Sequence, residues 1–346
     1  MENEIKLTKL AKCAGCGAKV GTGVLSQLIE GLKVHKDDNL LVGFDKSDDA
    51  SVYQISEELA LVQTIDFFPP IADDPYIYGQ IAATNALSDI YAMGGEPTCA
   101  QNVLIIPEDM PANAVHQILR GGCDKIYEAG ALITGGHSIY GEVPIYGLAV
   151  TGFVHPSKLI VNSNAKVNDI LFLTKPLGVG LLINGKKAGI LSAEGETFMN
   201  TLMTTLNKKP RDLMVKYNVH ACTDVTGFSL LGHAIEMAQG SNVSIELNVN
   251  NIDIIPEALE IAHQGKLSKG LLRNKNYASY YTDFQNNIDM EHQYVLFDPQ
   301  TSGGLLIAVD PAQADAFYQE LQDNVPSAQK IGRVIEQQKK AIFVTK

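Results

Sequence analysis

Short apolar segments of strand-like composition alternate along the whole chain with longer segments of helical periodicity. Glycine, proline and polar clusters separate the two kinds of segment. Because apolar residues at i, i+3 and i+4 indicate a helix and short β-branched runs indicate a strand, this alternation predicts a mixed α/β or α+β fold. The chain has no fixed-period repeat and no low-complexity tract. The predicted strands are 40–44, 50–56, 59–66, 101–107, 131–136, 145–154, 170–176, 243–251, 303–310 and 341–346; the predicted helices are 24–33, 74–95, 111–130, 196–208, 228–239 and 311–324.

The pattern divides the chain into a loop and two domains. The 346 residues suit two domains of roughly 100–200 residues, each able to bury its own core. The strand signal stops at His155-Pro156, and the polar stretch SNAKVND precedes a new strand. The glycines of AGCGAKVGTG predict a mobile segment. We therefore expect a mobile N-terminal loop at 1–23, an N-terminal domain at 24–156 and a C-terminal α/β domain at 157–346.

The charge balance and the cysteine content exclude several classes of protein. With 39 acidic and 27 basic residues, the net charge of −12 disfavours binding to nucleic acid or anionic membranes and suits a site that gathers cations. The 5 scattered cysteines indicate a reducing compartment, not a disulfide framework. No signal peptide and no apolar run of the ~18–20 residues needed for a membrane span is recognisable. We expect a cytoplasmic protein.

Aspartates stand where strands end or helices begin. Asp48 and Asp49 precede a predicted strand, Asp66 ends another, Asp89 lies on a predicted helix, and Asp224 precedes the helix predicted from 228. If the fold brings these positions together, their oxygens suit Mg²⁺, which takes a few carboxylates and leaves room for water and nucleotide phosphates. The alternative is a turn residue at Asp48, a helix cap at Asp224 and a solvated helix position at Asp89. Spacing alone leaves both interpretations open.

The glycine-rich loop carries a thiol and an ammonium group, Cys16 and Lys19. An ammonium near a thiol lowers the thiol pKa and increases the fraction of nucleophilic thiolate. The alternative is a buried or incidental cysteine in an ordinary loop. Cys13 and Cys16 also form a CxxC pair, which permits redox chemistry. A zinc site is disfavoured because the sequence offers no second CxxC or HxxxH.

Two glycine-containing segments are candidates for phosphate-binding loops. Gly135 and Gly136, with His137 and Ser138, follow the apolar residues ALIT, and form either a turn between strands or a close backbone approach to phosphate or another chain. The stretch Gly180–Lys187 nearly matches a P-loop. It has lysine where a hydroxyl should reach Mg²⁺, so we reject that interpretation.

Taken together, the motifs resemble those of the selenophosphate synthetase (selenide, water dikinase) family, in the aminoimidazole ribonucleotide synthetase-like superfamily. The likeness runs nearly end to end, and the AGCGAK loop separates the selenium enzymes from the other members. The motifs are AGCGAK, DDASVY, TIDFFPP, AATNALSDIYAMGGEP, GGHSIYGEVPIYGLAVTG, LFLTKPLGVG, TDVTGFSLLGHAIEMAQG, RNKNYASY and FDPQTSGGLL.

The resemblance implies a two-domain α/β fold that forms a homodimer, in which the N-terminal domains bind ATP and Mg²⁺ and build a shared β-barrel. It also implies the synthesis of selenophosphate, AMP and orthophosphate from ATP, selenide and water. Ala18 departs from the family, many members of which have a second cysteine there. The implied roles are catalysis for Cys16 and Lys19; Mg²⁺ binding for Asp49, Asp66, Asp89 and Asp224; and nucleotide binding for Lys19, Lys46, Ser47, Asp48, Asp66 and Asp89, with His137, Ser138 and Ile139 reaching ATP from the partner subunit.

Three other functions stay open at this point. A superfamily relative would phosphorylate another acceptor, as thiamine phosphate kinases do. A regulatory paralogue would bind ATP without chemistry and should lack Cys16 or Lys19, both of which are present. A CxxC module would hold zinc or form a Cys13–Cys16 disulfide.

Overall fold

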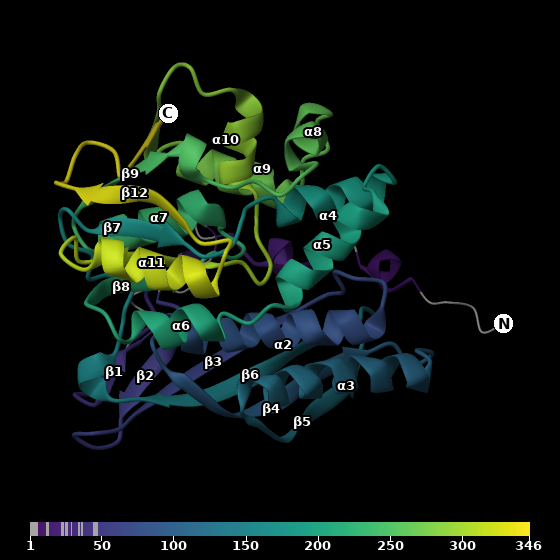
Figure 1. Ribbon diagram of the computed structural model, residues 1–346. Helices are drawn as coiled ribbons and strands as arrows, with labels where there is room; N and C mark the ends of the chain where they lie inside the picture. The colour runs from purple at the N-terminus through teal and green to yellow at the C-terminus, as the bar shows by residue number, and fades with distance from the viewer. Residues whose placement is uncertain are drawn as a thin grey trace.

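The computed structural model describes residues 6–11, 14–21, 24, 27–28, 30–33, 35, 37–43 and 48–346. It contains two β-sheets, one built from residues 40–154 and the other from 170–345, with helix α2 between the first sheet and the C-terminal half (Figure 1). The mixed α/β fold predicted from the sequence is confirmed. The predicted boundary at 156/157 falls in the short 3-10 turn Pro156–Lys158 that follows the first sheet; the division into domains stays a prediction.

The first sheet has six strands in the order β1-β2-β3-β6-β4-β5. Only β4 and β5 pair in parallel; the other neighbours are antiparallel. Alternate residues of β3 are buried, so one face packs against the helices and the other is exposed. The strands are β1 Leu40–Val42, β2 Ser51–Gln54, β3 Ala60–Phe68, β4 Glu96–Ile106, β5 Leu132–Tyr140 and β6 Ile145–Val154.

Helix α2 (Pro75–Ala92) is the central element of the molecule. The Asp74 side chain caps it by accepting the N–H groups of Tyr76 and Ile77, and Pro75 occupies its first turn. Nearly the whole helix is buried, because it contacts β3 and β6 on one side and β8 and α5 of the C-terminal half on another. It packs very closely on α3 (Ala112–Ala129): a Cβ at Gly79 would lie 2.0 Å from the Ile118 carbonyl oxygen.

The second sheet has seven strands in the order β10-β13-β9-β12-β7-β11-β8. All residues of β11 are buried, as are the last three residues of its neighbour β7. The strands are β7 Ile170–Leu173, β8 Val219–Asp224, β9 Ser244–Asn248, β10 Thr282–Phe284, β11 Leu305–Val309, β12 Gln329–Ile335 and β13 Ile342–Thr345. The helices are α4 Val179–Ala188, α5 Ala193–Thr204, α6 Lys208–Met214, α7 Ser229–Gly240, α8 Ala258–His263, α9 Lys269–Ala278, α10 Met290–Phe297 and α11 Ala314–Asn324.

One local prediction was wrong, and one of two alternatives left open is excluded. The single helix predicted at 196–208 is divided between α5 and α6, because Thr205 leaves α5 with extended backbone. The turn considered at Gly135–Ser138 is instead the middle of strand β5, where these residues pair in parallel with 101–104 of β4. Both glycines have a φ in the region that favours glycine, which hides the strand from a propensity-based prediction. Parts of the helix predicted at 24–33 lie outside the described residues.

The described part of the N-terminal loop is packed against the body of the protein. It forms two 3-10 turns, Leu7–Leu10 and Gly15–Ala18, and Leu7 and Cys16 are both buried. The Thr8 hydroxyl donates to Asp73 at 2.6 Å. Long-range contacts therefore order this glycine-rich segment in the conformation described. Among the described residues, no helix has both the length and the hydropathy to cross a bilayer.

Candidate active site

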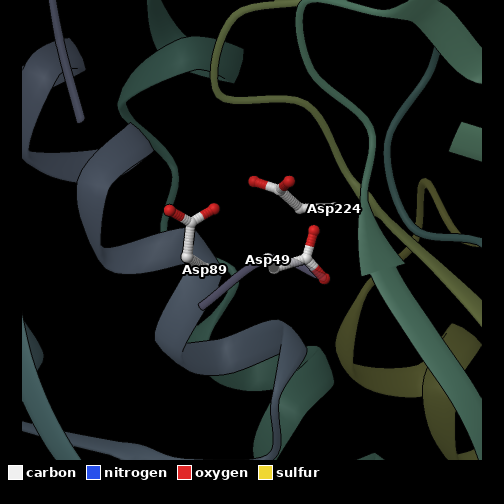
Figure 2. A group of neighbouring side chains, drawn as sticks. All are labelled: Asp49, Asp89 and Asp224. Atoms are coloured by element: carbon white, nitrogen blue, oxygen red, sulfur yellow. The ribbon is translucent and has the colours of Figure 1, made fainter. Parts of the chain in front are cut away.

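Three carboxylates that are remote in sequence meet at the junction of the two halves. Asp49 precedes β2, Asp89 lies on α2 and Asp224 is the last residue of β8. Each contributes an oxygen to a set in which all three lie within 4.8 Å of one another. Figure 2 shows the side chains of the three aspartates gathered around one space. The structure thus brings together three of the four aspartates expected to bind Mg²⁺, and we refer to Asp49, Asp89 and Asp224 as the carboxylate cluster.

A hydroxyl group holds each member of the carboxylate cluster. Thr223 Oγ1 donates to Asp49 at 2.7 Å, and Thr64 Oγ1 donates to Asp89 at 2.5 Å. Ser88 donates to Asp224 and itself accepts a bond from Asn207. The three acids are therefore oriented by neutral donors, with no cationic side chain among these hydrogen bonds.

Burial and mutual repulsion make the carboxylate cluster costly to ionise. Burial raises the pKa of Asp49 and of Asp89 well above the ordinary carboxyl value, and the nearby Asp224 charge raises both further. Burial also raises the pKa of Asp224, although His233 and Ser88 oppose the shift. One oxygen each of Asp49 and Asp224 is buried without a hydrogen-bond partner among the described residues. Such an arrangement suits a multivalent cation, which would satisfy these oxygens and neutralise the repulsion.

The N-terminal loop places Lys19 and Cys16 beside the carboxylate cluster. Lys19 Nζ lies 3.3 Å from Asp66 Oδ2 on β3. Burial alone would lower the pKa of Lys19, but Asp66 and the other acids around the ammonium raise it well above its ordinary value. Asn85, one turn before Asp89 on α2, donates to Asp66 at 2.5 Å and accepts from the Cys16 thiol at 3.2 Å. One amide thus connects the thiol to the carboxylate that pairs with Lys19.

In this conformation the structure favours the alternative interpretation, a buried cysteine, over activation of Cys16 by Lys19. Cys16 is only 1% exposed. Burial raises the pKa of its thiol to about 12, which outweighs the opposing effect of the Lys19 charge. The sequence showed the nearby ammonium but could not show the loss of solvent. With the loop docked, Cys16 is a protonated thiol that donates to Asn85.

The remaining predicted residues occupy three different situations. Asp48 accepts the backbone N–H of Asn162 and of Asp49, so it stabilises the turn that presents Asp49. His137, Ser138 and Ile139 are exposed on β5, which β6 and β4 separate from β3. Lys46, Ser47 and Cys13 lie outside the described residues.

Sequence reasoning missed a set of residues that support the site from the C-terminal half. Lys175 is buried and donates to the carbonyl oxygens of Leu202, Thr205 and Ser302 at 3.2, 2.7 and 2.7 Å. Burial lowers the pKa of Lys175 to about 7 because it disfavours the charged form. The three carbonyl acceptors, in contrast, match the three donors of a charged ammonium group. Ser302 has a left-handed φ of 51° and donates its N–H to Asn85 at 2.8 Å. The only sequence signal was the run TKP before a glycine-rich segment, which does not indicate these partners.

Comparison with known proteins gives a consistent family. The AIR synthase related protein models match this chain over residues 47–154 (N-terminal domain) and 166–345 (C-terminal domain). A selenide, water dikinase of Treponema denticola is 48% identical over 350 residues, with 100% of this chain and 99% of that protein covered. A selenide, water dikinase of Clostridium botulinum (strain Eklund 17B / Type B) is 45% identical, with 99% and 100% covered.

Solved structures share the fold at low sequence identity. AaThiL complexed with AMPPCP and TMP superposes with a TM-score of 0.69 at 19% identity, covering 94% of this chain and 93% of the other. A thiamine-monophosphate kinase from Stenotrophomonas maltophilia K279a gives 0.65 at 18% identity, covering 93% and 94%. These likenesses show the fold alone.

Proposed function

This chain belongs to the selenide, water dikinase family of AIR synthase-related proteins, and we propose that it makes selenophosphate from selenide, ATP and water, releasing AMP and orthophosphate. The observation that carries the proposal is the carboxylate cluster facing a loop that holds Cys16 and Lys19. The family relatives cover the whole chain, so the proposed activity concerns the complete set of motifs.

The residues of the carboxylate cluster fit a divalent metal ion, and we propose Mg²⁺. Their donors are hard oxygens, two of them are buried without a partner among the described residues, and the acids repel one another. Asp49, Asp89 and Asp224 would hold the ion. Asp66 differs from them, because it already pairs with Lys19 and Asn85. When bound, Mg²⁺ would neutralise the charge of the ATP phosphates.

The chain's own groups divide the remaining work. Lys19 supplies a positive charge at the place where the phosphates meet the N-terminal loop, and its pairing with Asp66 fixes the ammonium there. Asn85 holds the Cys16 thiol while Thr301 Oγ1 accepts the Cys16 N–H at 3.0 Å. The docked loop excludes water from this region. The γ-phosphoryl group passes to selenide, and water then attacks the remaining ADP to release orthophosphate and AMP.

We further propose that the chain acts as a homodimer. Within the described residues, strand β5 is an unpaired edge of the first sheet, and Ile139 on it is 50% exposed. Ile65 and Phe67 leave apolar surface on the uncovered face of the same sheet. In one chain, His137–Ile139 are separated from Asp66 by two strands, which supports a contact of these residues with the nucleotide of a second copy. Ile139→Lys should convert a dimer to a monomer in light scattering; a wild-type monomer would contradict the proposal.

Phosphorus NMR of the products tests the activity directly. Under anaerobic conditions with Mg²⁺, the protein should convert ATP to selenophosphate, AMP and orthophosphate only when selenide is added. Asp49→Asn and Asp224→Asn should abolish ATP consumption, whereas Asp109→Asn, an exposed aspartate, should leave it unchanged. ATP turnover that stops at ADP, or full turnover in the cluster variants, would refute the proposal.

The role of Cys16 needs a separate variant. Cys16→Ala removes the thiol and leaves Lys19 and the carboxylate cluster in place. Loss of selenide-dependent product with retained nucleotide binding is expected if the thiol handles selenium. Normal product formation would show that the thiol is dispensable.

A further inference from the structure

A cavity borders the loop that carries Cys16. Its volume is about 410 Å³, and it opens between α4, α9 and the loop segment that contains Ala14 and Gly17. Thr301 and Pro299, which precede β11, complete the wall. No member of the carboxylate cluster lines this space. It is therefore a distinct approach to the loop that carries Cys16.

The cavity is positively charged in a strongly acidic protein. Lys187 at the end of α4 and Lys269 at the start of α9 line it, and no aspartate or glutamate of the described part of the chain does. Neither lysine forms an ion pair with another described residue, whereas the adjacent Lys186 pairs with Asp73 and Glu196. Two uncompensated ammonium groups in a chain of net charge −12 create a local potential of the opposite sign.

Neutral donors add to the same preference. Asn184 lines the cavity, and its Nδ2 is buried with no hydrogen-bond acceptor among the described residues. At the start of α9, the Ser268 hydroxyl accepts the N–H of Leu271, while the N–H groups of Lys269 and Gly270 precede the first intrahelical bonds. Positive charge and unsatisfied hydrogen-bond donors thus border the cavity, and together they suit an anion.

A residue that lines the cavity is hydrogen-bonded to Cys16. Thr301 lines the cavity, and its Oγ1 accepts the backbone N–H of Cys16 at 3.0 Å. Gly17 lines it too, and its carbonyl accepts from Arg273 of α9 at 2.9 Å. An anion in the cavity therefore lies against the segment that bears the thiol and, three residues later, Lys19.

We propose that this cavity, between α4, α9 and the Cys16 loop, is the entry site for the selenium substrate as a small anion, hydrogen selenide. The inference rests on the proposed function. At neutral pH hydrogen selenide carries a negative charge, as the phosphates of ATP do, so the two substrates repel each other and separate approaches suit them. ATP arrives with cations at the carboxylate cluster, and hydrogen selenide arrives through the basic cavity.

The test removes the charge of the cavity without altering the carboxylate cluster. In Lys187→Gln/Lys269→Gln, the KM for selenide, added anaerobically as sodium hydroselenide, should rise about fourfold, roughly twofold for each unit charge acting across ~10 Å of water-like dielectric. The KM for ATP should not change. In about 0.5 M KCl the difference from wild type should disappear because salt screens the charges. The charge-preserving variant Lys187→Arg/Lys269→Arg should behave like wild type.

A matched double variant controls for net charge. Lys330→Gln/Lys339→Gln removes the same charge elsewhere on the surface and should leave the KM for selenide unchanged. An equal rise in this control, an unchanged KM in the cavity variant, or failure of the arginine pair to restore it would overturn the entry site. Absence of any selenide-dependent product from the wild type would instead overturn the proposed function itself.

Discussion

Replacing Asp89 by asparagine should stabilise the metal-free protein although it removes a native carboxylate. The cluster oxygens lie within 4.8 Å of one another. At that separation two unit charges repel by about 3 kcal/mol for an effective dielectric constant of about 20. Partial protonation of the cluster reduces this repulsion. We therefore expect Asp89→Asn to increase the free energy of unfolding by about 2–3 kcal/mol, which corresponds to an increase on the order of 5 °C in the melting temperature. Thr64 remains able to donate to the amide oxygen of the new side chain.

Differential scanning calorimetry in EDTA and in Mg²⁺ measures this effect. The wild type should melt higher with Mg²⁺ than with EDTA, because the cation binds only the folded cluster. Asp89→Asn should melt higher than wild type in EDTA and show little further increase with Mg²⁺. Asp109→Asn, which removes an exposed carboxylate, should match the wild type in both conditions. A lower melting temperature for Asp89→Asn in EDTA, or an undiminished Mg²⁺ effect, would refute the electrostatic reasoning.

The stability difference between Asp89→Asn and the wild type should depend on pH in a defined direction. Folding raises the pKa of Asp89, so the folded state binds the proton more tightly than the unfolded chain does. The resulting stability is present below the ordinary carboxyl pKa and is lost as pH rises through the raised value. The difference in melting temperature between Asp89→Asn and the metal-free wild type should therefore become smaller as pH falls from about 8 to about 5.5. A difference that becomes larger over this range would contradict the raised pKa.

Three further predictions concern the loop. Alkylation of Cys16 by iodoacetamide should be slow in the native protein and accelerate nearly tenfold per pH unit up to about pH 9, since the thiol pKa is raised to about 12; a pH-independent rate would contradict a buried thiol. Arg273→Ala, which removes the donor to the Gly17 carbonyl, should speed that alkylation severalfold with little change in melting temperature, and an unchanged rate would show that this bond does not hold the loop. Lys19→Met should lower kcat for selenide-dependent ATP consumption by about 10²-fold or more while leaving the Mg²⁺-induced increase in melting temperature intact; a selective loss of that increase would place Lys19 at the metal instead.

The sequence indicated which elements carry the candidate aspartates better than the arrangement that supports them. Asp89 could be placed because α2 has a clear cap and a clear end, and Asp66 because it belongs to an apolar strand, although β3 continues two residues beyond the predicted end, to Phe68. The meeting of Asp49 with Asp224 depends on how the two halves pack, which local patterns do not encode. Thr223, which holds Asp49, stands next to Asp224 in the chain, but nothing in its spacing indicates that bond.

The differences between sequence and structure share a physical cause. The state of Cys16 stayed open because a nearby charge is visible in a sequence, whereas solvent exclusion by Asn85 and Thr301 is not. The strand predicted at 131–136 ends before β5 does because Gly135 and Gly136 have low strand propensity, and the pairing of β5 with β4 overrides that preference. Tertiary contacts decided each of these positions.

The carboxylate cluster draws its members from both halves of the molecule, with Asp49 and Asp89 on one side of the junction and Asp224 on the other. A metal ion bound by all three aspartates would crosslink the two halves of the molecule. Removal of the ion by a chelator would therefore weaken the contact between the halves as well as stop the reaction. Backbone amides of α2 near Asp89 and of β8 should then exchange hydrogen faster in EDTA, while those of the distant β12 keep their rate. The concentration of the divalent cation would in this way determine how rigidly the two halves are held together.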